Sequence, residues 1–196
     1  MRIIGLTGGS GVGKGAVAAR MRALGAGWVD ADAVYRSLCQ ANGEMLAALD
    51  AAFSGVLTES GALDRPKLAR IVFADAAKLQ KLNEITVPYI RAASLAEIER
   101  QSGRPIVLYD APTLFEAGAD EFCDKTVGVL AGRAARVRRV MERDGLTEEA
   151  ARARILAQPD DAFYRGKCDY IIENNGDLAA LWRETDALYQ ILSKGD

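Results

Sequence analysis

A glycine-rich stretch near the N-terminus contains the residues with the clearest chemical potential. The run from Gly8 to Lys14 matches the first seven positions of the phosphate-binding pattern GxxxxGK followed by Ser or Thr. Glycines allow successive backbone N–H groups to converge on phosphate oxygens, and the dipole of a following helix favours the same anion. Lys14 adds a compact positive charge for the terminal phosphates. The pattern predicts ATP binding by Gly9, Gly11, Val12, Gly13, Lys14, Gly15 and Ala16.

Two other interpretations of this glycine run stay open at this stage. It could form a tight strand-to-helix turn without a ligand, in which case Lys14 would stand at the required position by accident. It could also bind a dinucleotide, but the acidic residue that such a site needs about 20 positions further on is only loosely matched by Asp30 or Asp32.

The position after the lysine departs from the pattern. Gly15 stands where a hydroxyl side chain normally reaches Mg²⁺, and the next residue, Ala16, offers no replacement. Magnesium keeps several water ligands in most protein sites, so water can take the place of the hydroxyl. We therefore expect altered or weaker metal ligation and intact ATP binding.

Two carboxylates, Asp30 and Asp32, follow a short apolar run. A carboxylate at the carboxyl end of a strand points into the crevice where α/β folds bind ligands, and there it could accept a proton from an attacking hydroxyl. Arg36 lies four residues after Asp32, so a helix that begins near Asp32 carries both on one face. Helix capping is the structural alternative for Asp32.

Five apolar runs read as strands that could position these groups. Their continuous apolar character is typical of a parallel sheet covered by helices on both faces, so the fold class is α/β. The predicted strands are Arg2–Thr7, Trp28–Asp30, Pro105–Tyr109, Thr126–Leu130 and Tyr170–Glu173.

Helical spacing fills most of the remaining chain. The long stretch between the second and third strands exceeds what a crossover needs and predicts an inserted helical subdomain, in which Asp64 caps a helix and Pro88 interrupts another. A second helical pair follows the fourth strand. The predicted helices outside the insertion are Lys14–Leu24, Arg133–Arg143, Thr147–Ala157 and Leu178–Leu192.

Composition excludes several other classes of function. The 196 residues carry 25 basic and 27 acidic side chains, and a net charge of −2 gives no general attraction to nucleic acid or anionic membrane. Three separated cysteines and no histidine argue against zinc and a disulfide framework. The sequence shows neither a secretion signal nor an apolar run of membrane-spanning length, so we expect a cytoplasmic protein.

Several longer motifs make the sequence similar to the dephospho-CoA kinase family along nearly its whole length. The more specific ones are GALDRPKLARIVFAD at Gly61–Asp75, LQKLNEITVPYIR at Leu79–Arg91 and VLYDAPTLFEAG at Val107–Gly118. The others are GLTGGSGVGKG at Gly5–Gly15, DADAVYR at Asp30–Arg36, RVRRVMERDGL at Arg136–Leu146, ARILAQ at Ala153–Gln158 and CDYIIENNG at Cys168–Gly176.

The resemblance implies a P-loop NTPase three-layer fold with a five-stranded parallel sheet, a helical acceptor-binding insertion and a helical lid. The corresponding ranges are about 1–31, 104–131 and 168–196 for the core, 32–103 for the insertion and 132–167 for the lid. The implied reaction is phosphorylation of the ribose 3′-hydroxyl of dephospho-CoA by ATP with Mg²⁺, the last step of coenzyme A biosynthesis. No protein partner is indicated.

The resemblance also implies roles for individual residues. Lys14 would hold the phosphates, Asp32 would act as the base, Arg139 would stabilise the transferring phosphoryl group, and Asp110 would lie near the metal. The implied acceptor-binding residues are Asp32, Arg36, Leu63, Asp64, Arg65, Asn83, Ile85 and Glu116. Structural alternatives exist for some of these: Arg139 could be solvated, as exposed arginines commonly are, and Asp64 could be a helix cap only.

Departures from the family pattern keep two further functions open. Val87 replaces the histidine that usually precedes the proline of the LN.I.HP block, and Thr113 replaces an apolar residue. These changes suggest a kinase with another nucleoside or nucleotide as acceptor. The missing hydroxyl at Gly15 suggests a nucleotide-binding regulator with little or no catalysis.

Overall fold

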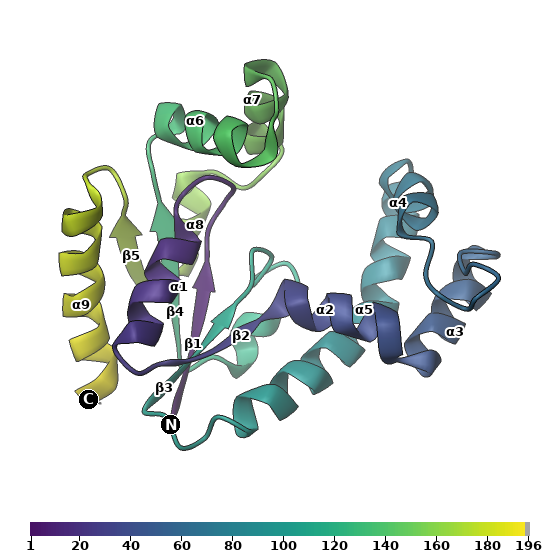
Figure 1. Cartoon of the computed structure of the whole chain (residues 1–196), viewed down its shortest axis with the longest axis horizontal. Helices are drawn as coiled ribbons and strands as arrows, with labels where there is room; N and C mark the ends of the chain where they lie inside the picture. The colour runs from purple at the N-terminus through teal and green to yellow at the C-terminus, as the bar shows by residue number, and fades with distance from the viewer. Residues whose placement is uncertain (195–196) are drawn as a thin grey trace. The chain divides into compact units, whose positions relative to one another are not determined.

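Five short strands form a parallel sheet in the order β2-β3-β1-β4-β5 (Figure 1). The structure, a computed structural model, describes residues 1–194. The first strand pairs in parallel with β3 and β4, and β4 pairs in parallel with β5. The predicted strands are confirmed, each end within one residue: β1 (Arg2–Thr7), β2 (Gly27–Asp30), β3 (Ile106–Asp110), β4 (Lys125–Leu130) and β5 (Tyr170–Glu173).

The main hydrophobic core lies between the sheet and two helices, α1 (Lys14–Ala23) and α9 (Leu178–Lys194), which pack side by side (Figure 1). Met21 of α1 and Leu188 of α9 join buried strand residues such as Leu108 in this core. All residues of β3 are buried, which explains the apolar run that precedes its last residue, Asp110. Packing against the sheet fixes the start of α1, and hence the glycine loop before it.

The segment after β4 forms helices that complete the same part of the molecule. Predicted helices α6 (Arg133–Asp144) and α7 (Glu148–Leu156) share a small core of their own. A third helix, α8 (Asp161–Lys167), was not predicted because its seven residues carry no helical apolar period. Its start is specified instead by Asp160, whose carboxylate accepts a hydrogen bond from the Phe163 N–H at 2.9 Å. A short 3₁₀ turn, η1 (Ala119–Phe122), precedes β4.

The chain folds as two compact units. One unit contains Met1–Val29 and the chain from Arg100 onward, and the other is Asp30–Glu99. The second unit has its own core, to which Met45, Leu49 and Leu68 contribute. Its helices are α2 (Ala31–Ala41), α3 (Gly43–Phe53), α4 (Arg65–Phe73) and α5 (Ala76–Glu99). The roles of acceptor-binding insertion and lid remain predictions.

Helix α5 corrects one sequence expectation. We predicted that Pro88 interrupts the helical stretch here, but α5 runs without interruption from Ala76 to Glu99 with Pro88 in its interior. Proline lacks a backbone N–H and therefore removes one helical hydrogen bond. Packing of residues on both sides of it, Leu82, Ile85 and Tyr89, against the second core supports the continuous helix. Tertiary packing has overridden a local propensity.

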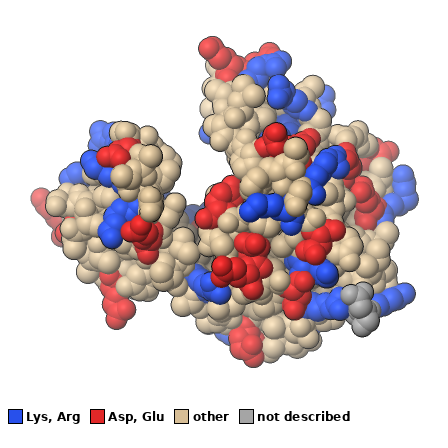
Figure 2. All heavy atoms as spheres, turned by 180° about the vertical axis from the view of Figure 1, so that it is seen from behind, with Lys and Arg blue, Asp and Glu red and all other residues tan. Residues whose placement is uncertain are grey.

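Charged side chains of both signs are interspersed over the surface. Figure 2 shows Lys and Arg next to Asp and Glu across the face drawn, with neither sign forming a continuous field. Among the described residues, no helix is both long enough and apolar enough to span a membrane.

The interior position of Pro88 generates a stability prediction. Pro88→Ala restores a backbone N–H and removes a residue that destabilises a helix interior by about 3 kcal/mol relative to alanine. The substitution also makes the unfolded chain more flexible, which lowers the stability by about 1 kcal/mol. We expect the free energy of unfolding to rise by roughly 2 kcal/mol in urea titrations. Lys78→Ala, an exposed substitution in the same helix, is the control and should change it little. A loss of stability in Pro88→Ala would contradict this account.

Candidate functional site

The glycine loop between β1 and α1 has a backbone that only glycine accepts at three positions. Gly8, Gly11 and Gly13 have φ angles of +144°, +78° and +96°. A Cβ atom on Gly8 would approach the Val129 carbonyl oxygen to 2.5 Å, and one on Gly11 would approach the Arg136 carbonyl oxygen to 2.5 Å. Both conformation and close backbone approach therefore require the glycines of the motif.

Four backbone N–H groups of this loop are left for a ligand, as an anion site requires. Within residues 1–194, the N–H groups of Gly11, Gly13, Lys14 and Gly15 donate no hydrogen bond to another protein atom. They stand at the N-terminus of α1, where the helix dipole favours negative charge. The arrangement fits the phosphate chain of a nucleotide.

The carbonyl groups of the same loop have protein donors. The Val12 and Ala16 N–H groups bond to the carbonyls of Gly9 and Gly13 at 3.4 and 3.0 Å. Arg139 Nη1 donates to the Gly11 and Val12 carbonyls at 3.1 and 3.3 Å. Asn174 Nδ2, from the segment after β5, also donates to the Val12 carbonyl at 2.8 Å. Arg139 is thus anchored on the loop, which contradicts the structural alternative of a solvated arginine.

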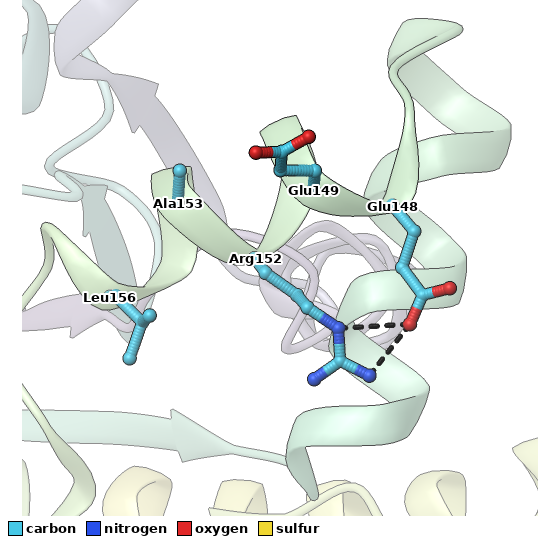
Figure 3. A pocket seen from close by; sticks show the side chains of 5 residues that line it. All are labelled: Glu148, Glu149, Arg152, Ala153 and Leu156. Atoms are coloured by element: carbon cyan, nitrogen blue, oxygen red, sulfur yellow. Dashed lines mark hydrogen bonds and ion pairs between the residues drawn. The ribbon is translucent and has the colours of Figure 1, made fainter.

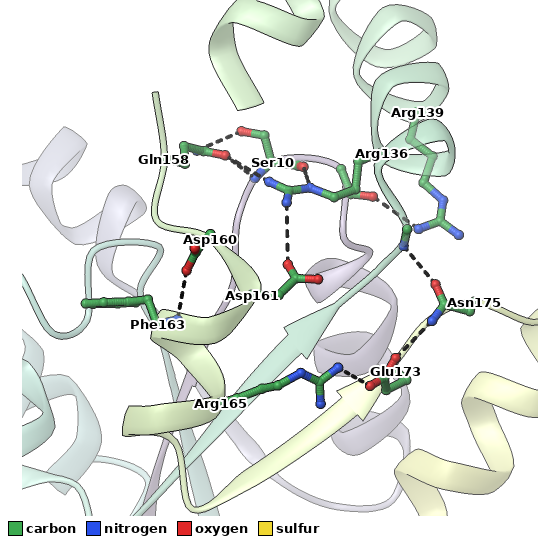
Figure 4. Close-up of polar contacts among 12 residues, drawn as sticks. Ser10, Arg136, Arg139, Gln158, Asp160, Asp161, Phe163, Arg165, Glu173 and Asn175 are labelled. Carbon is green, nitrogen blue, oxygen red and sulfur yellow. Dashed lines mark hydrogen bonds and ion pairs between the residues drawn. The ribbon is translucent and has the colours of Figure 1, made fainter. Parts of the chain in front are cut away.

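Arg136, Ser10 and Gln158 form a second set of contacts on the loop (Figure 4). Arg136 Nε donates to the Ser10 carbonyl at 3.0 Å. Gln158 Oε1 accepts from the Ser10 N–H at 2.8 Å, and its Nε2 donates to Ser10 Oγ at 3.1 Å. Burial lowers the pKa of Arg136, but arginine remains charged at neutral pH. Arg136 also lies 3.9 Å from an Asp161 carboxylate oxygen.

Sequence reasoning missed these loop contacts. Arg136 is 6% exposed and lies one helical turn before the fully buried Val140 of α6. An arginine on the apolar face of an amphipathic helix was the available signal. Gln158 and Asn174 gave no such signal, because they follow regular elements and their contacts depend on how those elements pack.

Lys14 and Asp110 form an ion pair at the carboxyl end of β3. Lys14 Nζ bonds to Asp110 Oδ1, and the two side chains are only 18% and 8% exposed. Asp110 Oδ2 accepts a hydrogen bond from Trp28 Nε1 at 3.4 Å. The predicted phosphate-binding lysine and the predicted metal-proximal carboxylate are therefore in direct contact.

The residues present fit a magnesium site of the kind that keeps most of its water. No group of three or more Cys, Asp or Glu side chains that could hold a metal exists among the described residues. Asp110 supplies one carboxylate beside the loop, and magnesium commonly uses one or two carboxylates with waters and substrate phosphates. A side chain on Gly15 would meet nothing within 4 Å, so the position has room for the missing hydroxyl.

Asp30 has the structural role that we considered for Asp32. It is the N-cap of α2, and its Oδ1 accepts hydrogen bonds from the N–H groups of Asp32 and Ala33 at 2.9 and 3.1 Å. Its Oδ2 also forms an ion pair with Arg36 Nη2 at 3.4 Å, so the carboxylate that Arg36 pairs with is that of Asp30 and not that of Asp32. The Asp32 side chain is exposed and accepts no hydrogen bond within residues 1–194. The capping alternative for Asp32 is therefore wrong.

The other predicted acceptor residues of the second unit divide into packed and exposed side chains. Leu63 is buried in the unit's core and Ile85 packs against it. Asp64 caps α4 as predicted, accepting from the Lys67 N–H at 3.0 Å. The Arg65 guanidinium lies 5.9 Å from the centre of the Tyr35 ring, and Asn83 is exposed. These positions leave their binding roles as predictions.

Glu116 lies on the loop after β3, within the first unit. It is exposed, and its charge acts together with burial to raise the pKa of the Tyr164 hydroxyl to about 12, with burial the larger cause. The neighbouring Phe115 ring packs edge-on against Phe163, with centroids 5.8 Å apart. Lys167 Nζ lies 5.2 Å from the Phe115 ring centre. The carboxylate thus borders a cluster of aromatic side chains.

A surface hollow on α7 is not part of this site. Figure 3 shows Arg152 bonded to Glu148, at 2.9 Å from Nε and 2.6 Å from Nη2. The residues that line it are Glu148, Glu149, Arg152, Ala153 and Leu156. None of them is a predicted site residue, and the guanidinium of the hollow is already paired with Glu148.

Comparison with known proteins decides the family. The sequence model for dephospho-CoA kinase matches residues 2–180. The chain belongs to the dephospho-CoA kinase family. It is 41% identical over 187 residues to a dephospho-CoA kinase of Arabidopsis thaliana, covering 94% of this chain and 81% of that protein. It is 41% identical over 195 residues to one of Geobacillus kaustophilus, covering 94% and 97%. The predicted family is therefore confirmed.

Solved structures agree with this assignment and with the fold class. TT1252 from Thermus thermophilus matches with a TM-score of 0.83 and 36% identity over 97% of both chains. Dephospho-CoA kinase from Campylobacter jejuni matches with a TM-score of 0.71 and 28% identity over 98% of both. A shikimate kinase from Bacteroides thetaiotaomicron, 14% identical with a TM-score of 0.52, shares the fold alone. The predicted P-loop kinase fold is confirmed.

The open space at Gly15 makes a gain-of-ligand test possible. Gly15→Ser adds a hydroxyl where this position normally reaches Mg²⁺, without a steric conflict. We expect turnover to reach half its maximum at several-fold lower Mg²⁺ concentration than in the parent chain. Gly15→Ala is the matched control, since it adds the Cβ alone. Equal Mg²⁺ dependence in all three proteins would show that the metal site is arranged differently.

The Lys14–Asp110 pair predicts separable effects on stability and binding. Lys14→Met should abolish ATP binding and also cost roughly 1–3 kcal/mol of stability, because Asp110 stays buried without its counter-charge. Adding Asp110→Asn should recover much of that stability and none of the ATP binding. Calorimetric ATP titration and urea unfolding measure the two quantities. ATP binding by folded Lys14→Met would contradict the role of Lys14.

Proposed function

We propose that this chain transfers the terminal phosphoryl group of ATP to the ribose 3′-hydroxyl of dephospho-CoA, giving CoA and ADP. This is the final step of coenzyme A biosynthesis. The observation that carries the proposal is the loop that ends at Lys14 and leaves four N–H groups without a protein partner within residues 1–194, in a chain that matches the dephospho-CoA kinase family over residues 2–180. The chemistry asks little covalent work of the protein: it aligns donor and hydroxyl and neutralises charge.

On the donor side, the proposal assigns phosphate binding to the loop. The free N–H groups between Gly11 and Gly15 would hold the phosphate chain, and Lys14 would exchange Asp110 for the terminal phosphates. Arg139 already donates hydrogen bonds to the loop's carbonyl groups, so its guanidinium would add positive charge beside the transferring phosphoryl group. Magnesium, when bound, supplies charge neutralisation across the phosphates, and Asp110 is the residue that would hold it.

On the acceptor side, Asp32 would accept the proton of the attacking hydroxyl. Support comes from Asp30, which satisfies the start of α2 and leaves the Asp32 carboxylate exposed and without a structural partner within residues 1–194. The other residues that the family resemblance implies for acceptor binding would contact dephospho-CoA. They are Arg36, Leu63, Asp64, Arg65, Asn83, Ile85 and Glu116.

The cellular compartment belongs to the same proposal. All three cysteines are free, and burial raises the pKa of the Cys123 and Cys168 thiols to about 12, which keeps them protonated and unreactive. Free thiols are typical of reducing compartments, and this supports the cytoplasm.

An acceptor panel tests the reaction directly. ADP release should be measured with ATP, Mg²⁺ and one acceptor at a time: dephospho-CoA, adenosine, AMP, CMP and pantetheine phosphate. We expect release with dephospho-CoA far above the others, and a product whose new phosphate is on the ribose 3′-oxygen. Lys14→Met controls for contaminating kinases. Preferential use of another acceptor would overturn the assignment of substrate, and no release with any of them would overturn catalysis.

Asp32→Asn distinguishes the proposed base from a structural residue. Asparagine keeps the shape but cannot accept a proton at neutral pH, so turnover should fall about 10²–10⁴-fold, equivalent to roughly 3–5 kcal/mol of barrier. ATP affinity, measured by calorimetry, should stay unchanged. Asp30→Asn is the matched control, because asparagine caps a helix as well as aspartate and turnover should persist. Unchanged turnover in Asp32→Asn, with loss in Asp30→Asn, would transfer the role to Asp30.

A further inference from the structure

Trp28 contacts the Asp110 carboxylate at the oxygen that Lys14 does not bond. Its indole Nε1–H donates to Asp110 Oδ2 at 3.4 Å, while Lys14 Nζ bonds Oδ1. Asp110 is 6% exposed, so this buried carboxylate has one cationic and one neutral donor, each on its own oxygen. Neither the glycine motif nor the carboxylates considered above point to this tryptophan.

The backbone of Trp28 is held by a single side chain. Strand β2 lies at the edge of the sheet, where backbone groups on the outer side lack a neighbouring strand. Gln101 fills that place: its Oε1 accepts from the Trp28 N–H at 2.9 Å, and its Nε2 donates to the Trp28 carbonyl at 3.2 Å. A Cβ on Gly27 would lie 2.6 Å from Gln101 Oε1, so the adjacent glycine gives this side chain room.

The ring of Trp28 is fixed as well. The Arg22 guanidinium of α1 lies 4.6 Å from the ring centre, within range of a cation–π contact. The side chain is partly buried and packs against the main core. With backbone, ring face and edge all in contact, the Nε1–H is held toward Asp110.

The geometry points to Trp28 as a positioning residue that holds Asp110 in place while Lys14 moves to the phosphates. This inference rests on the proposed function. When Lys14 exchanges Asp110 for a phosphate group, the buried carboxylate loses its counter-charge. A buried carboxylate without any donor is costly, so the indole N–H lowers the cost of the exchange. It also keeps Oδ1 directed toward the loop, where Asp110 would hold magnesium.

Trp28→Phe removes the N–H donor and retains an aromatic ring for Arg22 and the core. We expect kcat to fall roughly 10-fold, the size of effect that one lost hydrogen bond produces. The Mg²⁺ concentration for half-maximal turnover should rise several-fold, while KM for dephospho-CoA should stay within twofold. Trp182→Phe is the matched control: Trp182 is 41% exposed on α9, with a guanidinium, that of Arg20, 5.4 Å from its ring centre. It should leave all three quantities unchanged.

A spectroscopic readout tests the contact without turnover. The chain has two tryptophans, so Trp182→Phe leaves Trp28 as the sole indole emitter. In that background, adding Asp110→Asn removes the negative charge beside the indole and should shift the emission maximum. Titration of Trp182→Phe with ATP and Mg²⁺ should also change the emission, because Asp110 then exchanges Lys14 for the metal. This measurement decides the contact even if Trp28→Phe fails to fold.

Several outcomes would overturn the inference. One is a folded Trp28→Phe with the kcat and Mg²⁺ dependence of Trp182→Phe; another is a lower melting temperature alone, which would show a purely structural role. Emission that Asp110→Asn and ATP with Mg²⁺ both leave unchanged would exclude the contact in solution. Failure of the proposed function would give a different result. The parent chain would then not phosphorylate dephospho-CoA, while ATP would still change the Trp28 emission of Trp182→Phe.

Discussion

The site depends on one constraint: the glycine loop must leave several N–H groups free while most of its carbonyl oxygens are satisfied. A loop that bonded both to itself would offer no phosphate site, and one that bonded neither would carry buried unsatisfied groups. Here Arg136, Arg139 and Asn174 supply donors to the carbonyls of Ser10, Gly11 and Val12. The Gly9 and Gly13 carbonyls accept from the nearby N–H groups of Val12 and Ala16. Within residues 1–194, this division leaves the N–H groups of Gly11, Gly13, Lys14 and Gly15 without a protein acceptor.

This constraint connects distant parts of the chain. The donors come from α6 and from the segment after β5, both far from the loop in sequence, and Gln158 after α7 holds Ser10. The predicted lid segment therefore contributes to the shape of the phosphate site itself. On the other side of the loop, Lys14 is balanced by Asp110, whose second oxygen is held by Trp28 from the edge strand. The position of Lys14 is thus coupled to packing around the sheet.

Two nearby aspartates, Asp30 and Asp32, illustrate how a structural role and a proposed chemical role separate. The N–H groups at a helix N-terminus need a side-chain acceptor, and Asp30 supplies it for α2. The same carboxylate also forms an ion pair with Arg36. The residue two positions on is thereby relieved of a structural task, which makes it available as a base. Gly15 shows the reverse case, since its surroundings have space for a hydroxyl that the sequence does not supply.

The sequence by itself determined the strands, most helices, the glycine loop with Lys14, and the family. These features are local: apolar period, cap residues and contiguous motifs are present in short stretches. The tertiary structure decided which aspartate caps α2, that α5 continues through Pro88, and that Trp28, Arg136, Gln158 and Asn174 contact the loop or Asp110. Those outcomes depend on packing between segments up to 162 residues apart, where neighbouring surfaces outweigh local preference and no sequence period records the contact.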